Sequence, residues 1–191
     1  GFIVGFDTEK NAVADTMIDL IEDAAIPVCM VGLLYALPNT QLTRRLEREG
    51  RLYPEPAVVP KGNVDQCTHG LNFDTLRPKQ DILLDYKRVL ETIYDPVAFA
   101  GRLRRLAGLL DNSRRKRQTR ADYARRKFGA SEMLNRIITN MPEPRDVFWQ
   151  TFTECMSVNP RSARWLMALM ALYLHLGPFS RYVVQQIEQK I

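Results

Sequence analysis

The chain has few of the residues from which disulfide and metal frameworks are built. Among 191 residues there are three cysteines and two histidines. Cys29, Cys67 and Cys155 are odd in number and far apart, which argues against a disulfide framework and predicts a reducing, cytoplasmic setting. Long hydrophobic runs are missing too. The strongest late run, residues 165–176, falls well short of the roughly 20 residues that span a bilayer, and no signal peptide is recognisable, so we expect a soluble protein.

Positive charge is present but unevenly spread. The net charge is +5, yet residues 101–127 hold eleven Lys or Arg against two Asp. The densest part is residues 114–127, from Arg114 to Lys127. A solvated loop or helix face is the favoured interpretation. An anionic membrane or anionic substrate is an alternative partner. Nucleic acid is disfavoured, because there is one basic block and no recognition motif.

The first 36 residues predict a strand, a helix and a second strand. The opening "GFIVGFD" reads as a strand buried on both faces, followed by a turn. Residues 11–25 carry apolar side chains at helical spacing, and residues 26–35, "IPVCMVGLLY", form another continuous apolar run. This order is a βαβ unit with parallel strands and a right-handed crossover.

Two parallel strands do not make a stable sheet by themselves. We therefore expect the chain to be the tail of a larger α/β protein. The alternative is a dimer in which the strands of two copies pair. In either case the edge of the first strand favours self-association, since nothing charged blunts it.

The rest of the chain predicts helices and loops. Residues 53–78 read as an irregular connection and residues 79–191 as a helical domain, which leaves residues 1–52 as the βαβ segment. Thr40 and Asp95, the latter followed by Pro96, are expected to begin helices. Residues 161–176 are apolar almost all round and predict a central buried helix, which Gly177 and Pro178 should end.

The two histidines and three cysteines are the residues most typical of metal sites. His69 lies two residues after Cys67 in "DQCTHGLNF", so a metal site is conceivable, but a solvated loop is favoured because further ligands are lacking nearby. His175 reads as a core or helix-end histidine. Cys29 and Cys155 read as small buried apolar groups.

The segments "GFIVGFD", "MVGLLYALPNTQLTRRLEREGRL" and "LNF" resemble the C-terminal part of cobalamin-binding-domain radical S-adenosylmethionine (SAM) proteins. The resemblance implies an α/β remnant, the end of a partial TIM-like barrel, followed by a mainly α-helical domain. The whole is expected to be predominantly helical. The partner of this segment would be the remainder of the parent chain.

The resemblance also implies a cofactor surface. In the family a Gly-x-Ile-x-Gly strand lies against the adenine of SAM, and Gly1, Ile3 and Gly5 match that pattern. The next strand would end near Leu34 to Pro38, which makes Leu34 and Pro38 candidate contacts. The acidic residue that often follows the pattern has no clean match, since Glu9 comes one position late.

The same resemblance sets limits on catalysis. The parent would carry a 4Fe–4S cluster on a Cys-x3-Cys-x2-Cys loop, together with cobalamin, and would transfer a methyl group or carry out a related radical reaction. The three cysteines lack that spacing. We therefore assign no catalytic residue and no metal ligand, and expect a non-catalytic fragment. The alternatives are a free-standing dimeric helical interaction module and a basic adaptor for nucleic acid or membrane surfaces.

Overall fold

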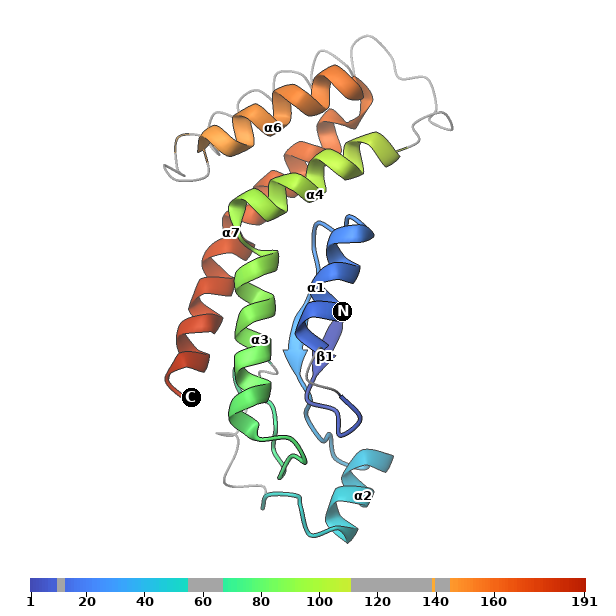
Figure 1. Cartoon of the computed structure of the whole chain (residues 1–191), viewed down its shortest axis with the longest axis vertical. Coiled ribbons are helices and arrows are strands. Elements are labelled where there is room, and N and C mark those ends of the chain that lie inside the picture. The colour runs from blue at the N-terminus through green and yellow to red at the C-terminus, as the bar shows by residue number, and fades with distance from the viewer. Residues whose placement is uncertain (10–12, 55–66, 111–138, 140–144) are drawn as a thin grey trace. The chain divides into compact units, whose positions relative to one another are not determined.

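The computed structural model describes residues 1–9, 13–54, 67–110, 139 and 145–191. The chain divides into two compact units (Figure 1). Unit 1 comprises Gly1–Asp19, Cys29–Thr92 and Ser180–Ile191, and unit 2 comprises Leu20–Val28 and Ile93–Phe179. The sequence predicts a division into residues 1–52, 53–78 and 79–191, whereas each compact unit contains residues from both before and after position 78. The predicted division therefore stays a prediction about the parent protein.

A small parallel sheet opens unit 1, as the sequence predicts. Strand β1 (Phe2–Val4) is followed by helix α1 (Val13–Asp23) and strand β2 (Val31–Leu33). The strands pair in parallel, with Ile3 opposite Gly32. The strand–helix–strand prediction is confirmed. The second strand is much shorter than the run of residues 26–35 suggested, because apolar character alone does not mark where pairing begins.

Helix α2 (Gln41–Arg48) begins and ends where its sequence indicates. Thr40 caps it, since the Thr40 hydroxyl accepts a hydrogen bond from the Thr43 N–H at 3.2 Å. Gly50 follows the helix with a φ of +67°, the left-handed conformation that ends helices. Leu46 is completely buried and anchors the helix in unit 1.

Helix α3 (Lys79–Ile93) packs against the βαβ segment within unit 1. The Tyr86 hydroxyl donates to the backbone oxygen of Val31 at 3.1 Å, which ties α3 to β2. The Arg88 guanidinium lies 2.5 Å from the Asp15 carboxylate on α1. These two contacts link α3 to β2 and to α1. Among the described residues the sheet has two strands, β1 and β2.

Unit 2 is helical. It contains α4 (Pro96–Leu109), α6 (Arg145–Val158), the short 3-10 helix η2 (Pro160–Ser162) and the first part of α7 (Ala163–Glu188). Asp95 caps α4 as predicted, accepting from the N–H groups of Val97 and Ala98. Three rings form the core: Tyr173 lies 4.7 Å from Phe99 and 5.0 Å from Phe148, centroid to centroid. Cys155 is buried beside them in the same unit, and Cys29 is buried in unit 1, as predicted.

Helix α7 corrects two expectations. It continues through Gly177 and Pro178, so the predicted helix end is wrong. A proline inside a helix costs about 3 kcal/mol, and burial of apolar side chains at helical spacing on both sides of it offsets that cost. The helix is also not buried all round, since Trp165 is 46% and Leu172 50% exposed. In the described residues no helix is long and apolar enough to cross a membrane.

Candidate functional site

The carboxyl ends of β1 and β2 lie side by side, at the edge where α/β proteins bind their ligands. Gly5 directly follows β1 and is buried, with a φ of +114° that side chains disfavour. A Cβ placed there would lie 2.6 Å from Leu71 and 3.5 Å from Leu34. Glycine is therefore required at this turn, which agrees with its place in the sequence pattern.

Glu9 holds the Gly5 turn closed. Both oxygens of its carboxylate lie 2.9 Å from the Gly5 N–H, which donates to them. The Glu9 side chain is only 8% exposed. A backbone turn in which the Glu9 N–H donates to the Phe6 oxygen returns the Glu9 side chain to Gly5. Spacing alone did not reveal this.

The guanidinium of Arg77 lies close to the Glu9 carboxylate. The Arg77 guanidinium donates to Asp85 at 2.6 Å, and its Nη1 lies 3.7 Å from Glu9. Two of its nitrogens, Nε and Nη1, are buried without a hydrogen-bond partner. The carboxyl end of β1 is therefore an ordered ionic site in which one cation keeps unused donors.

The end of β2 is closed by a loop segment. Leu34 is buried; its N–H donates to the Val4 oxygen at 2.8 Å, and its own oxygen accepts from the Leu71 N–H at 2.7 Å. Asn72 continues the pairing, because its side-chain amide exchanges two hydrogen bonds with the backbone of Ala36. Residues 71–72 thus pair with the segment that directly follows β2.

The remaining predicted contacts are spread along the sheet. Ile3 is 44% exposed and lies opposite Gly32, while Met30, two residues before Gly32, is 73% exposed. Gly1 precedes β1 and lies at the amino end of the strand, and Pro38 is exposed in the turn before α2. Gly5 and Leu34 are thus brought together, Ile3 lies on the open face, and Gly1 and Pro38 lie outside this contact.

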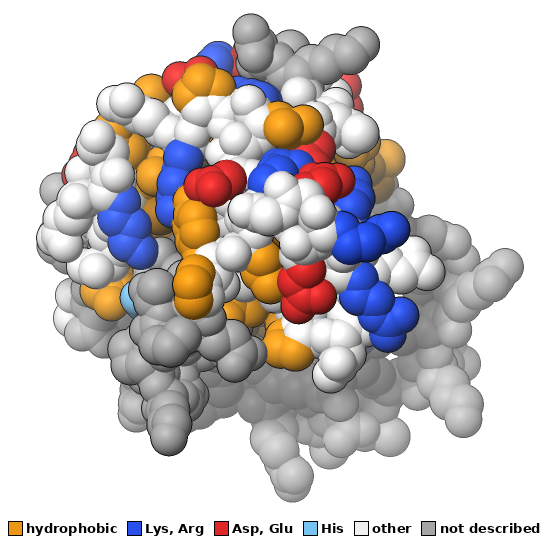
Figure 2. Space-filling view, turned by 90° about the horizontal axis from the view of Figure 1, so that it is seen from below, with side chains coloured by type: hydrophobic (Ala, Val, Ile, Leu, Met, Phe, Trp, Pro, Cys, Tyr) orange, Lys and Arg blue, Asp and Glu red, His pale blue; other side chains and the backbone are white. Residues whose placement is uncertain are grey.

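Arginines gather beside the same edge. Asp7 binds Arg45 and Arg51, each at 2.7 Å. The hydrogen bond from Arg51 is the main reason that the pKa of Asp7 lies below its usual value, and the same pair raises the pKa of Arg51. Figure 2 looks onto the α2 end and shows basic and acidic side chains interleaved there. A broad pocket of about 590 Å³ adjoins them. It is lined by Phe6, Asp7, Thr8, Gln41, Leu42, Arg44, Arg45 and Arg48.

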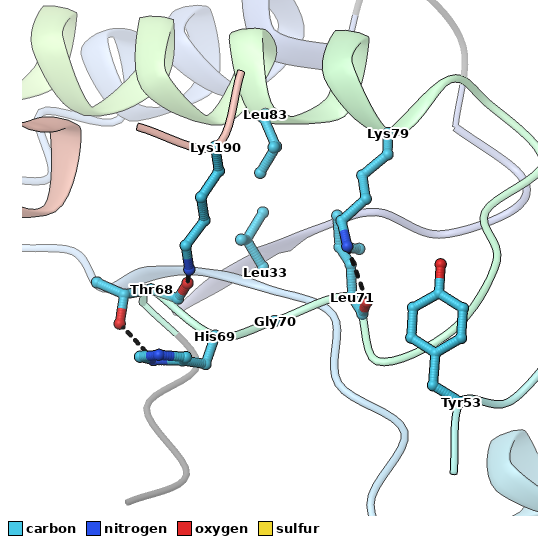
Figure 3. A pocket seen from close by; sticks show the side chains of 9 residues that line it. All are labelled: Leu33, Tyr53, Thr68, His69, Gly70, Leu71, Lys79, Leu83 and Lys190. Carbon is cyan, nitrogen blue, oxygen red and sulfur yellow. Dashed lines mark hydrogen bonds between the residues drawn. The ribbon is translucent and has the colours of Figure 1, made fainter. Parts of the chain in front are cut away.

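A second, smaller pocket of about 280 Å³ includes Leu71 in its lining. Figure 3 shows Lys79 and Lys190 on opposite sides of it, with Leu33 and Leu83 between them. The lining residues are Leu33, Tyr53, Thr68, His69, Gly70, Leu71, Lys79, Leu83 and Lys190. Lys190 comes from the far end of the chain, so no sequence pattern pointed to this pocket.

His69 belongs to this pocket rather than to a metal centre in the described residues. It is exposed, and its Nδ1 lies 2.8 Å from the Thr68 hydroxyl. No group of three or more His, Cys, Asp or Glu side chains that could hold an ion occurs in the part of the chain that the structure describes. His175 is exposed on α7 and stacks on Phe179 at 5.8 Å, so it is not a core histidine. The basic segment from Arg114 to Lys127 lies outside the described residues.

Residues 40–189 match the family described as "Domain of unknown function (DUF4070)". The match covers most of the chain, which therefore belongs to this family. It includes the predicted helical region and α2, while the Gly-x-Ile-x-Gly strand lies before it.

Two curated relatives carry methyl-transfer names. The chain is 42% identical over 102 residues to "Uncharacterized methyltransferase sll1242" of Synechocystis sp., which covers 53% of this chain and 18% of the relative. It is 32% identical over 102 residues to "Hopanoid C-2 methylase" of Rhodopseudomonas palustris, with 53% and 17% covered. The match thus spans less than a fifth of either relative. No solved structure matches this chain.

Proposed function

We propose that the chain is the C-terminal part of a larger methyltransferase of the cobalamin-dependent radical SAM class. In this proposal β1 and β2 are the last strands of the SAM-binding barrel, and the helices form a domain that covers the mouth of the active site. The names of the two relatives support methyl transfer, and the sequence resemblance supports the cofactor class.

The open edge of β1 carries the proposal. In a parallel pair, alternate residues point their backbone groups to opposite edges. Ile3 lies between the residues that bond to β2, so its N–H and C=O face the other edge. Among the described residues nothing bonds to them. Unpaired edges attract another strand, and in the proposed parent a preceding barrel strand would occupy this place.

The open face of the sheet suits a flat ring. Gly32 has no side chain beside Ile3, so the pair leaves a shallow apolar surface at the centre of the two strands. The Gly5 turn, held by Glu9, lies at the carboxyl end of β1, and without a side chain at Gly5 a ligand can approach the backbone there. These residues would contact adenine, while the sugar and amino acid parts of SAM would extend toward elements of the parent.

The cysteines of this chain do not fit an iron–sulfur cluster. Cys29 and Cys155 are buried and belong to different units, and Cys67 has no second cysteine near it in sequence. A cluster and cobalamin would be held by other parts of the parent. When bound there, cobalamin would carry the methyl group, and the cluster would supply the electron that generates a radical from SAM.

Calorimetric titration of SAM into the isolated chain tests this division of labour. One side of an adenine site is too little for tight binding, because the iron that would chelate the amino acid group is not supplied by these residues. We expect no micromolar affinity. A micromolar dissociation constant for the isolated chain would contradict the proposal.

Self-association is the second candidate role, and the same open edge favours it. Light scattering at increasing concentration distinguishes the two. A tight dimer that is dispersed by a charge on the strand, as in Ile3→Lys, would support pairing between copies. A monomer at every concentration would contradict self-association and would favour pairing of this edge with a strand of the parent protein.

A further inference from the structure

The pocket of Figure 3 draws its lining from separate segments of unit 1. Leu33 belongs to β2, Lys79 and Leu83 to α3, and Lys190 follows α7. Its volume of about 280 Å³ lies near the lower limit of small-molecule sites. Since a water molecule takes about 30 Å³ of liquid, the pocket accepts a ligand of roughly ten non-hydrogen atoms.

The floor of the pocket is apolar. Leu33, Leu71 and Leu83 line it, and each is 2% exposed or less. Gly70 runs directly over Leu33: a Cβ at position 70 would lie 2.1 Å from the Leu33 Cβ. The floor is thus fixed by close packing, and only a hydrocarbon group would find favourable contacts on it.

The rim is positively charged. Lys79 and Lys190 lie on it, and none of the nine described lining residues is acidic. Two carboxylates in adjoining segments have other partners. Asp74 accepts from the Tyr53 hydroxyl at 2.7 Å, and Glu188 binds Lys87 at 2.6 Å. The charge of the rim therefore favours an anion.

Lys79 can add a ligand without losing a strong contact. Its ammonium has three donors. It makes one long contact of 3.5 Å with the Leu71 oxygen, and it lies 5.7 Å from the centre of the Tyr53 ring. The Lys190 ammonium donates a hydrogen bond to the backbone oxygen of Thr68, on its own side of the pocket (Figure 3). An anionic group between the two ammonium groups would receive charge-assisted hydrogen bonds.

We propose that this pocket binds a small amphiphilic anion, a carboxylate or phosphate monoester on a short hydrocarbon tail. The head group lies between Lys79 and Lys190, and the tail lies on Leu33, Leu71 and Leu83. This inference does not rest on the proposed methyltransferase role, because the described residues that line the pocket all belong to unit 1 and binding is tested without SAM.

Titration of the chain with octanoate and with hexyl phosphate, followed by ¹H–¹⁵N NMR and calorimetry, tests the proposal. We expect one of the two to bind and to shift the amide signals of Gly70 and Leu71. Lys79→Met and Lys190→Met should each weaken binding about tenfold. Arg88→Met removes a cation from the same helix whose partner, Asp15, does not line the pocket, and should leave the affinity within about twofold.

Three outcomes would overturn the proposal. Octanol binding as tightly as octanoate would show that the charge plays no part. Acetate or inorganic phosphate binding as tightly as the tailed ligands would show that the apolar floor plays no part. Failure of both tailed ligands to shift Gly70 or Leu71, while the amide spectrum shows a folded chain, would remove the site altogether.

Discussion

The turn after β1 gives the sharpest test of how the site is held. Glu9→Ala removes the carboxylate that accepts the Gly5 N–H at 2.9 Å, in a side chain that is 8% exposed. A buried donor left without an acceptor costs about 1–3 kcal/mol. Arg77, whose Nη1 lies 3.7 Å from Glu9, loses a counter-ion as well. We expect the free energy of opening this turn to fall by about 2 kcal/mol.

Hydrogen exchange at the Gly5 amide measures that change locally, so it does not require the two units to unfold together. A loss of about 2 kcal/mol corresponds to roughly 30-fold faster exchange. Glu9→Gln keeps an acceptor oxygen and should show a smaller effect. Glu47→Ala, on the exposed surface of α2, is the matched control and should change stability by less than about 0.5 kcal/mol.

If Gly5 exchanges equally fast in Glu9→Ala and in the unchanged chain, Glu9 does not hold the turn. The description of Glu9 as the acceptor that closes the Gly5 turn would then be wrong. A loss of protection shared equally by Glu9→Ala and Glu47→Ala would likewise refute it, since it would show a general effect of removing negative charge.

Three further changes test other parts of the structure. Because the pKa of Asp7 is lowered in the folded state, chiefly by Arg51, its contribution is present above the ordinary value of 3.8 and is lost as the pH falls through the lower folded value. Urea unfolding should therefore show a steeper acid loss of stability for the unchanged chain than for Asp7→Asn, and equal slopes would contradict this. Gly70→Ala, with its Cβ 2.1 Å from the Leu33 Cβ, should lower the free energy of unfolding by about 1–3 kcal/mol, whereas Gly101→Ala, which meets nothing within 4 Å, should not lower it. Pro178→Ala should raise thermal stability, by up to about 3 kcal/mol, because it restores a helical N–H donor in α7; an unchanged or lower melting temperature would argue against a continuous helix.

Local chemistry was the part that could be predicted. The caps at Thr40 and Asp95 were evident because a side-chain oxygen and the N–H groups it receives lie within three residues. The βαβ order followed from hydrophobic spacing, and the parallel pairing from that order. These features depend on residues that are close together in the chain, so the sequence alone is enough to predict them.

Features that depend on distant residues could not be predicted in the same way. Asn72 bonds to Ala36, in the segment after β2, and Lys190 lines a pocket with Lys79; no periodicity in the sequence indicates either contact. The helix that passes through Pro178 depends on packing of the side chains before and after it. The spacing of the sequence does not connect Glu9 with Gly5, because the turn that brings its carboxylate to the Gly5 N–H is visible only in three dimensions.

The central proposal is that β1 and β2 present a surface for SAM within a larger methyltransferase. Hydrogen–deuterium exchange of the full-length protein, with and without SAM, tests it most directly. The proposal predicts added protection at Ile3 to Phe6 and at Leu34 to Ala36 when SAM binds, with no change on the α6 helix. Saturating SAM that protects other parts of the protein and leaves both of these segments unchanged would contradict it.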